Sequence, residues 1–426
     1  MESCRIKFHK PCMMELFDAN TNLLGFDNCV FDLENNILRP GQADDYITMS
    51  TKLFMPVKQN ELPISIDELW EKAQYRCDNK IRLTAERMEK EHPKKSWREH
   101  IEDEWDKIES TDELRSKSNK YFSRVLSDIY KFFEQIMPDN EVREYTFRYI
   151  AGRLCGDAID QKFSVWTGSG GNGKSMLIDL IQAAWGDYCK NLPVTLITQK
   201  RKASNAASPE KAVTKGVRIC HMAEPDTNER INTGEMKELS GGDTIQARKL
   251  YGDVFEFKPQ FEIILMCNEK PKIEDKSNGA WRRVLVTPFV SRFIDDKSKL
   301  DSSRNIYPRI LSLPNRIKKH FPVIFMLIML KQWVIMNTSE TEYRIPEKMS
   351  IETEDYKNSN DEIGRWIREE LIPCDNVTEF NELYEESCDW YNDLTGNGKF
   401  DRKSVRDRLL DWQCNQSGYG FVEGGI

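Results

Sequence analysis

The sequence predicts an α/β fold whose central part lies between residues 163 and 288, and three observations lead to this prediction. An apolar segment, Phe163–Thr167, runs into the glycine-rich stretch Gly168–Ser175, and an apolar-rich helical pattern follows. Two further apolar segments, Val217–Ala223 and Phe261–Cys267, have the composition of buried strands and end in polar residues. A last apolar segment, Val284–Val286, follows a pair of arginines. Strands separated by helical and polar stretches are typical of a parallel sheet with helices on its faces.

The glycine-rich stretch matches the pattern G-x-x-x-x-G-K-[ST], with a strand before it and a helix after it. Glycines let backbone N–H groups surround a polyphosphate, and the following helix N-terminus adds a favourable dipole. Lys174 is placed to reach the β- and γ-phosphates, and the Ser175 hydroxyl is placed to bind Mg²⁺. A glycine-rich turn without a ligand is the alternative, but the spacing, the Lys, the Ser and the flanks all favour a nucleotide site. The residues expected to bind ATP are Gly168, Ser169, Gly170, Gly171, Asn172, Gly173, Lys174 and Ser175.

The composition indicates a globular protein with a heavily charged surface. Of the 426 residues, 39% are hydrophobic and 31% are charged, and the net charge of −8 excludes a uniformly basic, histone-like protein. The first residues carry scattered charges and no apolar region, so secretion is not expected. The longest apolar run, Phe321–Leu330, is too short to span a bilayer and predicts a core helix. The 11 cysteines include no CxxC pair, which favours free thiols over a metal-binding finger.

Pattern changes divide the chain into five parts. Residues 1–65 read as short strands and turns. Residues 66–158 are charge-dense and helical, and they form either a solvated face or contacts between subunits. The α/β part occupies residues 159–336, and the polar stretch 337–361 is expected to be a linker. Residues 362–426 read as three helices and a terminal strand.

Acidic and amide side chains follow two of the predicted strands. Glu224 and Asp226 come after Val217–Ala223, and Asn268 comes after Cys267. Nucleotide-binding folds place their metal and water chemistry at such strand ends, beside the phosphate loop. Glu224 is therefore expected to polarise the attacking water, Asp226 to help hold Mg²⁺, and Asn268 to hydrogen-bond the γ-phosphate or the water. Capping of the next turn is the alternative for either acid, and turns favour Asn in any case.

Paired arginines, Arg282 and Arg283, precede the last predicted strand. They form either surface salt bridges or a finger that contacts a phosphate. A finger stabilises charge on the transferring phosphoryl group, and one donated in trans requires a neighbouring subunit.

Two basic segments are candidates for contacts with nucleic acid. Thr244–Ala247 is expected to be a short strand that leads into a hairpin tip carrying Arg248, Lys249 and Tyr251. Two cations and an aromatic side chain can follow a single-strand backbone and stack a base, whereas the alternative is an ordinary exposed hairpin. Thr198–Arg218 carries six Lys or Arg residues against one acid, and forms either a solvated loop or a phosphate-contacting one.

Together these segments resemble the superfamily 3 helicases, specifically the primase-helicase group of poxviruses, other large DNA viruses and some phages. The resemblance runs from about Asn20 to the end of the chain, and the order and spacing of the motifs match the family. The segment LLGFDNCVFDL resembles the family's entry into the helicase half, although Cys29 stands where many relatives have Gly. The most specific motifs read, in chain order, GSGGNGKS, TQKRKASNAASPE, AEPD, KELSGGDTIQARKLYGD, ILMCNEKP and WRRVLVTPF.

The resemblance implies an AAA+-like P-loop ATPase core, a ring of six subunits, ATP hydrolysis at subunit interfaces and DNA passing through a central pore. It also implies that the N-terminal helices form a collar and that residues 362–426 form a winged-helix-like module. That module either contacts duplex DNA or only packs on the ring. The motif positions assign Lys174 and Ser175 to Walker A, Glu224 to Walker B, Asn268 to sensor 1, Arg282 or Arg283 to the arginine finger, and Arg248 and Lys249 to the pore hairpin.

The function implied is that of an ATP-dependent DNA helicase in viral DNA replication, inside the host cell, at replication sites in the cytoplasm or nucleus. ATP and Mg²⁺ are the expected cofactors, and single-stranded and forked DNA are the expected partners. One alternative is a remodelling or initiation ATPase on DNA without processive unwinding. The other is a scaffold or loader that binds nucleotide without hydrolysing it.

Two features depart from the family pattern. Ala223 stands where many relatives carry a second acid, which leaves open which acid helps to hold Mg²⁺. The residues before Asn20 are too few for the primase domain that relatives commonly carry upstream. The chain is therefore expected to be the helicase half of a longer polypeptide or to work with a separate primase.

Overall fold

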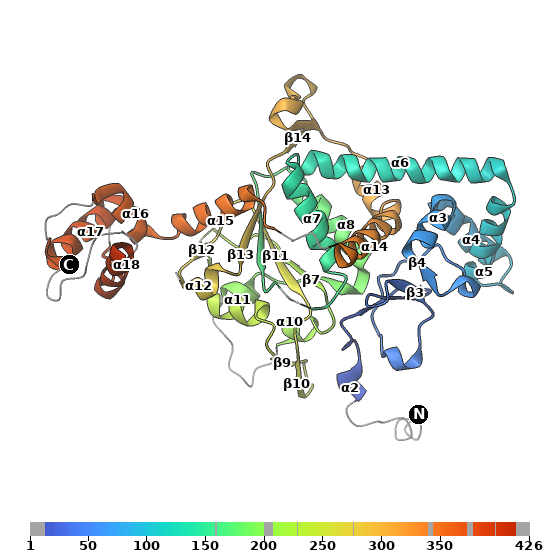
Figure 1. The fold of residues 1–426 in the computed structure, drawn as a ribbon, viewed down its shortest axis with the longest axis horizontal. Coiled ribbons are helices and arrows are strands. Elements are labelled where there is room, and N and C mark those ends of the chain that lie inside the picture. The colour runs from blue at the N-terminus through green and yellow to red at the C-terminus, as the bar shows by residue number, and fades with distance from the viewer. Residues whose placement is uncertain are drawn as a thin grey trace.

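Figure 1 shows the computed structural model of the protein, with a central α/β part, N-terminal helices on one side and a small group of C-terminal helices on the other. The structure describes residues 13–157, 160–199, 208–227, 229–275, 277–339, 344–372, 378–396 and 398–414.

A five-stranded parallel sheet forms the centre of the molecule, with the strand order β13-β5-β11-β7-β6. Numbered along the chain within this sheet, the order is 5-1-4-3-2. All five residues of β5 and of β13 are buried, as expected for parallel strands that helices cover on both faces. This confirms the predicted α/β class with a parallel sheet. The strands are β5 (Phe163–Thr167), β6 (Cys189–Asn191), β7 (Ile219–Met222), β11 (Glu262–Cys267) and β13 (Val284–Pro288).

Two hydrophobic clusters cover the two faces of this sheet, because side chains alternate between faces along a strand. Trp166 belongs to the first cluster, whereas its neighbour Val165 belongs to the second. The first cluster contains side chains from α6 (Asp112–Ile136), α7 (Asn140–Gly152), α8 (Lys174–Trp185), α13 (Leu313–Lys319) and α14 (Pro322–Thr338). The second contains side chains from α9 (Thr195–Thr198), α10 (Pro209–Ala212), α11 (Thr233–Ser240), α12 (Asn278–Trp281) and α15 (Glu347–Ser359).

An antiparallel sheet near the N-terminus docks onto the central part through two buried side chains, those of Arg218 and Tyr188. Arg218, just before β7, donates a hydrogen bond to the carbonyl of Leu23 at 3.3 Å and also contacts Gln260. Tyr188 accepts a hydrogen bond from the Gly25 amide at 2.9 Å. The short helix α2 (Met13–Leu16) precedes this sheet, whose strands are β1 (Leu23–Gly25), β2 (Val30–Asp32), β3 (Ile37–Arg39) and β4 (Ile64–Ser65).

Residues 66–152 are helical, in agreement with the sequence pattern. A capping box, Ser65 with Glu68, begins α3 (Ile66–Arg76), and another, Ser96 with Glu99, begins α5 (Trp97–Glu109). Between them lies α4 (Asn79–Glu91). The side chain of Arg76 is buried and forms ion pairs with Glu61 and Glu109, which tie α3 to its neighbours.

The ion pairs of Glu61 give these helices a pH-dependent stability. Burial raises the pKa of Glu61, but hydrogen bonds from Arg76 and Lys72 outweigh burial and lower this pKa to about 2. The unfolded-state value is about 4.3, so the stabilisation is present above roughly pH 5 and is lost as the pH falls towards 2. Glu61→Gln is therefore expected to unfold at lower urea concentration than the parent at pH 7, and the difference in midpoint is expected to shrink at pH 3. A difference that stays constant between the two pH values would contradict this account.

The expected linker over residues 337–361 is wrong for residues 347–359. These form α15, which packs against β13 and buries Met349 and Tyr356. Thr353 accepts a hydrogen bond through its hydroxyl from the Val286 amide at 2.9 Å. The polar composition suggested a linker because only one side of this helix faces the sheet, so most of its residues are polar and remain accessible to solvent.

The C-terminal group contains three helices, α16 (Glu362–Glu370), α17 (Phe380–Thr395) and α18 (Arg402–Cys414). They share a small hydrophobic cluster that includes Trp366, Phe400 and Val405. The terminal strand expected at residues 419–422 lies outside the described residues, so the winged-helix prediction stays a prediction.

In the described part of the chain, no single helix is long and apolar enough to cross a membrane. The pair α13 and α14 passes a test of length and composition together, with a bend of 66° between them. The first half of α14 is buried in the first hydrophobic cluster, as the core-helix prediction requires.

Candidate functional site

The glycine-rich loop connects the end of β5 to α8, and its glycines adopt conformations that other residues avoid. Gly168, Gly170, Gly171 and Gly173 all have φ values between 60° and 155°. A Cβ atom on Gly168 would lie 2.4 Å from the Phe289 carbonyl oxygen, so the close approach also requires glycine. The loop therefore curves tightly from the end of β5 to the N-terminus of α8.

Residues that follow β13 hold this loop, and the sequence motif gave no sign of them. The Phe293 amide, in β14 (Arg292–Ile294), donates a hydrogen bond to the Gly171 carbonyl at 2.8 Å. The Asn172 side-chain amide donates to the Phe289 carbonyl at 3.5 Å. More than 100 residues separate these partners in the chain, so only the tertiary structure brings them together.

Lys174 begins α8 and is almost fully buried. Its ammonium group donates hydrogen bonds to the Gly168 carbonyl at 2.7 Å and to the Asn268 side-chain oxygen at 3.3 Å. Burial lowers the pKa of Lys174, and the nearby charge of Glu224 opposes this effect. A buried cation whose hydrogen-bond acceptors are neutral oxygens would be stabilised by an anion beside it. Ser175, the next residue, is exposed at the same helix N-terminus.

Glu224 and Asn268 meet at the carboxyl edge of the sheet, after β7 and β11. The Glu224 carboxylate accepts hydrogen bonds from the Asn268 backbone amide at 2.7 Å and from the Asn268 side-chain amide at 2.8 Å. It also accepts one from the Glu269 amide at 3.0 Å. Asn268 thus joins Glu224 to Lys174, with its amide nitrogen towards the acid and its oxygen towards the lysine. The sequence pattern predicts that these three residues lie at one edge of the sheet, but it does not predict this chain of contacts.

Asp226 does not join this chain of contacts. Its side chain is exposed, and its backbone amide donates a hydrogen bond to Glu229 at 3.2 Å. Asp226 does line a polar cavity of about 540 Å³ together with Glu224 and Asn268. The structure therefore brings Asp226 near Glu224, and no contact among the described residues assigns a role to the Asp226 side chain.

The paired arginines lie at the opposite, amino edge of the sheet. They directly precede β13, whose register with β5 runs from Val284 opposite Phe163 to Pro288 opposite Thr167. About 13 Å of strand therefore separates them from the carboxyl edge. Arg282 is exposed and donates a hydrogen bond to the Gln161 side chain at 3.3 Å, whereas Arg283 donates to the Gly279 carbonyl at 2.5 Å. Within one chain, neither arginine meets Lys174.

The predicted hairpin is present between α11 and β11. Its strands are β9 (Ile245–Arg248) and β10 (Val254–Phe257), so Arg248 ends the first strand and Lys249 and Tyr251 lie in the tip. The Tyr251 side chain is fully exposed. The Ser208 amide donates to the Arg248 carbonyl at 3.0 Å and the Arg248 amide donates to the Ser208 hydroxyl at 3.1 Å, which fixes the hairpin to the preceding segment. The most basic part of that segment, residues 200–207, lies outside the described residues.

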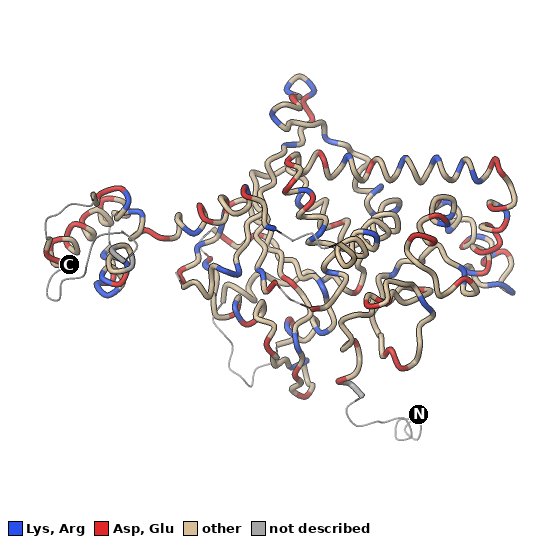
Figure 2. The backbone as a smooth tube through the Cα atoms, in the orientation of Figure 1, with Lys and Arg blue, Asp and Glu red and all other residues tan. Residues whose placement is uncertain are grey.

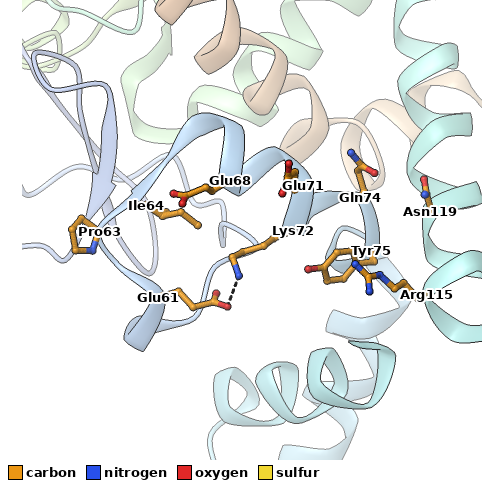
Figure 3. Close-up of a pocket in the computed structure, with 10 residues that line it drawn as sticks. All are labelled: Glu61, Pro63, Ile64, Glu68, Glu71, Lys72, Gln74, Tyr75, Arg115 and Asn119. Carbon is orange, nitrogen blue, oxygen red and sulfur yellow. Dashed lines mark hydrogen bonds and ion pairs between the residues drawn. The ribbon is translucent and has the colours of Figure 1, made fainter. Parts of the chain in front are cut away.

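A second polar cavity, of about 770 Å³, lies between β4, α3 and α6 (Figure 3). Lys72 and Glu61 form an ion pair of 2.8 Å beside it, and the Arg115 guanidinium lies 4.8 Å from the centre of the Tyr75 ring. None of its lining residues comes from the glycine-rich loop or from the ends of β7 and β11. This cavity is therefore separate from the candidate site.

Two protein families match parts of this chain. Residues 6–57 match the family described as "D5 N terminal like", and residues 166–283 match a "Family of unknown function (DUF5906)". The second match includes the whole glycine-rich loop, Glu224, Asn268, the hairpin and both arginines.

Curated relatives from large DNA viruses match nearly the whole chain. The protein "Putative helicase L207/L206" of Acanthamoeba polyphaga mimivirus is 31% identical over 97% of this chain and 38% of its own length. "Putative helicase 022R" of Frog virus 3 is 24% identical over 92% of this chain and 40% of its own length. "Putative primase C962R" of African swine fever virus is 22% identical over 61% of this chain and 28% of its own length. The chain thus spans about two fifths of the first two relatives.

Solved structures give a weaker likeness. Two structures of the NrS-1 C-terminal region are each 12% identical to this chain, with TM-scores of 0.37 and 0.41 over 68% and 71% of it. TM-scores this low do not support a conclusion about the fold or the function of the chain. On its sequence matches, the chain is a homologue of viral proteins named as putative helicases and putative primases, and its two family matches fit the primase-helicase group of superfamily 3.

Proposed function

We propose that this chain is the ATPase motor of a superfamily 3 DNA helicase that acts in viral DNA replication. The observation that carries the proposal is the chain of contacts from Lys174 through Asn268 to Glu224, beside a glycine-rich loop at the carboxyl edge of a parallel sheet. This edge is where open α/β sheets bind their ligands. Phosphoryl transfer to water needs a cation that binds the phosphates, and an amide and an acid that position and activate the water.

The residues present fit ATP and Mg²⁺. The backbone of residues 168–173 would surround the phosphates, and Lys174, buried against neutral oxygens, would neutralise their charge. The exposed Ser175 hydroxyl and the carboxylate oxygens of Glu224 and Asp226 are hard ligands of the kind Mg²⁺ prefers. Bound Mg²⁺ would neutralise charge on the phosphates, while Glu224 orients the attacking water.

The proposed motor is a ring of six subunits, and the position of Arg282 supports a site shared between neighbouring subunits. Arg282 lies at the edge of the sheet away from its own loop, so it would reach a phosphate only from the neighbouring subunit. The hairpin with Arg248, Lys249 and Tyr251 would then grip single-stranded DNA in the central pore. Forked DNA and a primase, on the same longer polypeptide or on a separate one, are the proposed partners. The proposed place of action is the viral replication site in the host cytoplasm or nucleus.

Steady-state ATP hydrolysis with and without single-stranded DNA tests this proposal. The parent chain is expected to turn over faster with DNA, and Lys174→Ala is expected to abolish turnover in both conditions. Unchanged turnover on addition of DNA would instead favour the remodelling ATPase. Binding without any turnover would favour the scaffold or loader.

The hairpin double variant, Arg248→Ala with Lys249→Ala, tests the grip. It is expected to lose the stimulation by DNA, because the two cations at the tip no longer hold the phosphate backbone. The matched control, Lys80→Ala with Lys94→Ala, removes the same charge from exposed positions around α4. Stimulation that survives in the hairpin variant would exclude the hairpin as the gripping element.

A further inference from the structure

A stripe of exposed cations runs along the outer face of α6. Lys117, Lys120, Arg124 and Lys131 are all exposed, and at about 100° per residue they fall within a sector of roughly 60°. The helix rises about 21 Å from the first to the last. Among the residues that the structure describes, none of the four has an acidic ion-pair partner. Glu113 lies in the same sector one turn earlier, in the first turn of the helix, where an acid is favoured.

Helix α13 lies beside this stripe, held by two polar contacts. Arg316 forms an ion pair with Asp128 of α6, and the Tyr121 hydroxyl lies 2.7 Å from the His320 ring nitrogen. Asp128 is thereby neutralised, so it does not offset the cations on either side of it.

The cations in this region crowd one another. Burial lowers the pKa of His320, the charge of Asp78 opposes this effect, and the charges of Arg316, Arg124 and Lys319 each add to the lowering. Burial also lowers the pKa of Arg316, and Arg124 adds to this effect. Clustered like charges cost folding free energy, which an anionic partner would recover.

The cationic surface continues into α13 and the excursion that precedes it. Residues 291–320 contain eight Lys or Arg residues against three acids, although the whole chain has a net charge of −8. This excursion includes β14 and β15 (Ile306–Pro308). Figure 2 shows cations repeated along α6 and on the loop that projects beyond it.

The composition of the stripe favours nucleic acid over a protein face. The exposed large apolar side chains of α6, Leu114 and Tyr130, lie roughly 100° away from the stripe around the helix. Protein interfaces are enriched in aromatic residues and depleted in lysine. Single-strand sites add aromatic platforms that stack bases, and this sector has none. A duplex needs only backbone contacts, because its bases are stacked inside it.

We propose that the stripe Lys117–Lys120–Arg124–Lys131 binds the phosphate backbone of duplex DNA, at a surface separate from the hairpin. The proposal rests on the proposed function, since it supplies a place for the duplex beside a motor that acts on one strand. A duplex carries one charge per about 1.7 Å, so a stripe of about 21 Å meets several phosphates. The last residue of α6, Ile136, contacts Gly173 of the glycine-rich loop, so the helix that would hold the duplex touches the candidate site.

Salt-dependent duplex binding tests the stripe. The full chain with the hairpin substitutions Arg248→Ala and Lys249→Ala is titrated with a labelled blunt duplex across a salt series. Adding Lys117→Ala, Lys120→Ala and Lys131→Ala is expected to lower the slope of log K against log salt by about 2 to 3, at roughly 0.9 per phosphate contact. An unchanged slope would overturn the proposal.

Matched controls separate this result from its alternatives. Lys80→Ala, Lys90→Ala and Lys94→Ala remove the same charge from exposed positions around α4, and they are expected to leave the slope as it was. A slope that falls equally with this control, or that falls for a single strand and not for the duplex, would overturn the assignment. The assignment would also be overturned if the stripe variant formed smaller assemblies while its duplex binding stayed unchanged. The partner of the stripe would then be an acidic face of a neighbouring copy. Because binding is measured without turnover, failure of the ATPase proposal would be seen separately.

Discussion

Arg282→Ala is expected to lower ATP turnover by about 10³-fold or more, while ATP binding persists. The guanidinium of Arg282 is exposed at the amino edge of the sheet, where only the Gln161 side chain holds it among the described residues. Its own loop lies at the carboxyl edge, so its charge would act on a phosphate bound to the neighbouring subunit. Binding of a fluorescent nucleotide and kcat, measured on the same preparation, separate the two effects.

Mixing experiments distinguish an arginine that acts in trans from one that only supports the fold. Arg282→Ala and Lys174→Ala are each expected to be inactive alone and to recover part of the turnover together, because some interfaces then combine an intact loop with an intact arginine. Differently tagged subunits that co-purify would show that mixed rings form. Absence of any recovery in such rings would contradict a trans site.

Arg283 provides the comparison for Arg282. Its guanidinium donates to the Gly279 carbonyl at 2.5 Å and burial lowers its pKa, so its contacts are within its own chain. Arg283→Ala is therefore expected to lower the melting temperature more than Arg282→Ala does. If mixing with Lys174→Ala restored turnover to Arg283→Ala but not to Arg282→Ala, Arg283 would be the finger.

Local patterns were sufficient to predict the centre of the fold. The segments read as strands at Phe163–Thr167, Val217–Ala223 and Phe261–Cys267 form β5, β7 and β11, each almost entirely buried. A short run of apolar residues bounded by turn residues has few other stable solutions in an α/β fold. The convergence of Lys174, Glu224 and Asn268 followed from the rule that parallel strands end at one edge.

Contacts between distant segments could not be predicted in the same way. The hydrogen bond from Phe293 to Gly171 and the docking of the N-terminal sheet on Arg218 depend on tertiary structure alone. Helix α15 looked like a linker because its buried positions, Met349 and Tyr356, are few among polar residues. The stripe on α6 was also hidden, because its cations are separated in sequence by other residues and share one side only when the segment is helical.

Glu224→Gln is expected to lower kcat by about 10² to 10⁴-fold and to leave ATP binding largely intact. The substitution removes the charge that orients water, whereas the contacts of Lys174 with the loop remain. It also disturbs Asn268. The carboxylate accepts both backbone amides through one oxygen and the Asn268 side-chain amide through the other. A glutamine presents an NH₂ group in place of one oxygen, so Asn268 must lose that bond or turn its amide.

Turning the Asn268 amide would remove the oxygen that Lys174 contacts at 3.3 Å, so a change at the acid reaches the lysine through one side chain. Asn268→Ala is accordingly expected to lower kcat in the same direction as Glu224→Gln. Asp226→Asn is the matched control, because it removes one negative charge from the same cavity, keeps one oxygen that could bind Mg²⁺ and does not touch Asn268. A much smaller loss of kcat is expected for it. Equal losses at Glu224 and Asp226 would mean that the charge of the cavity, and not the contact with Asn268, determines the rate.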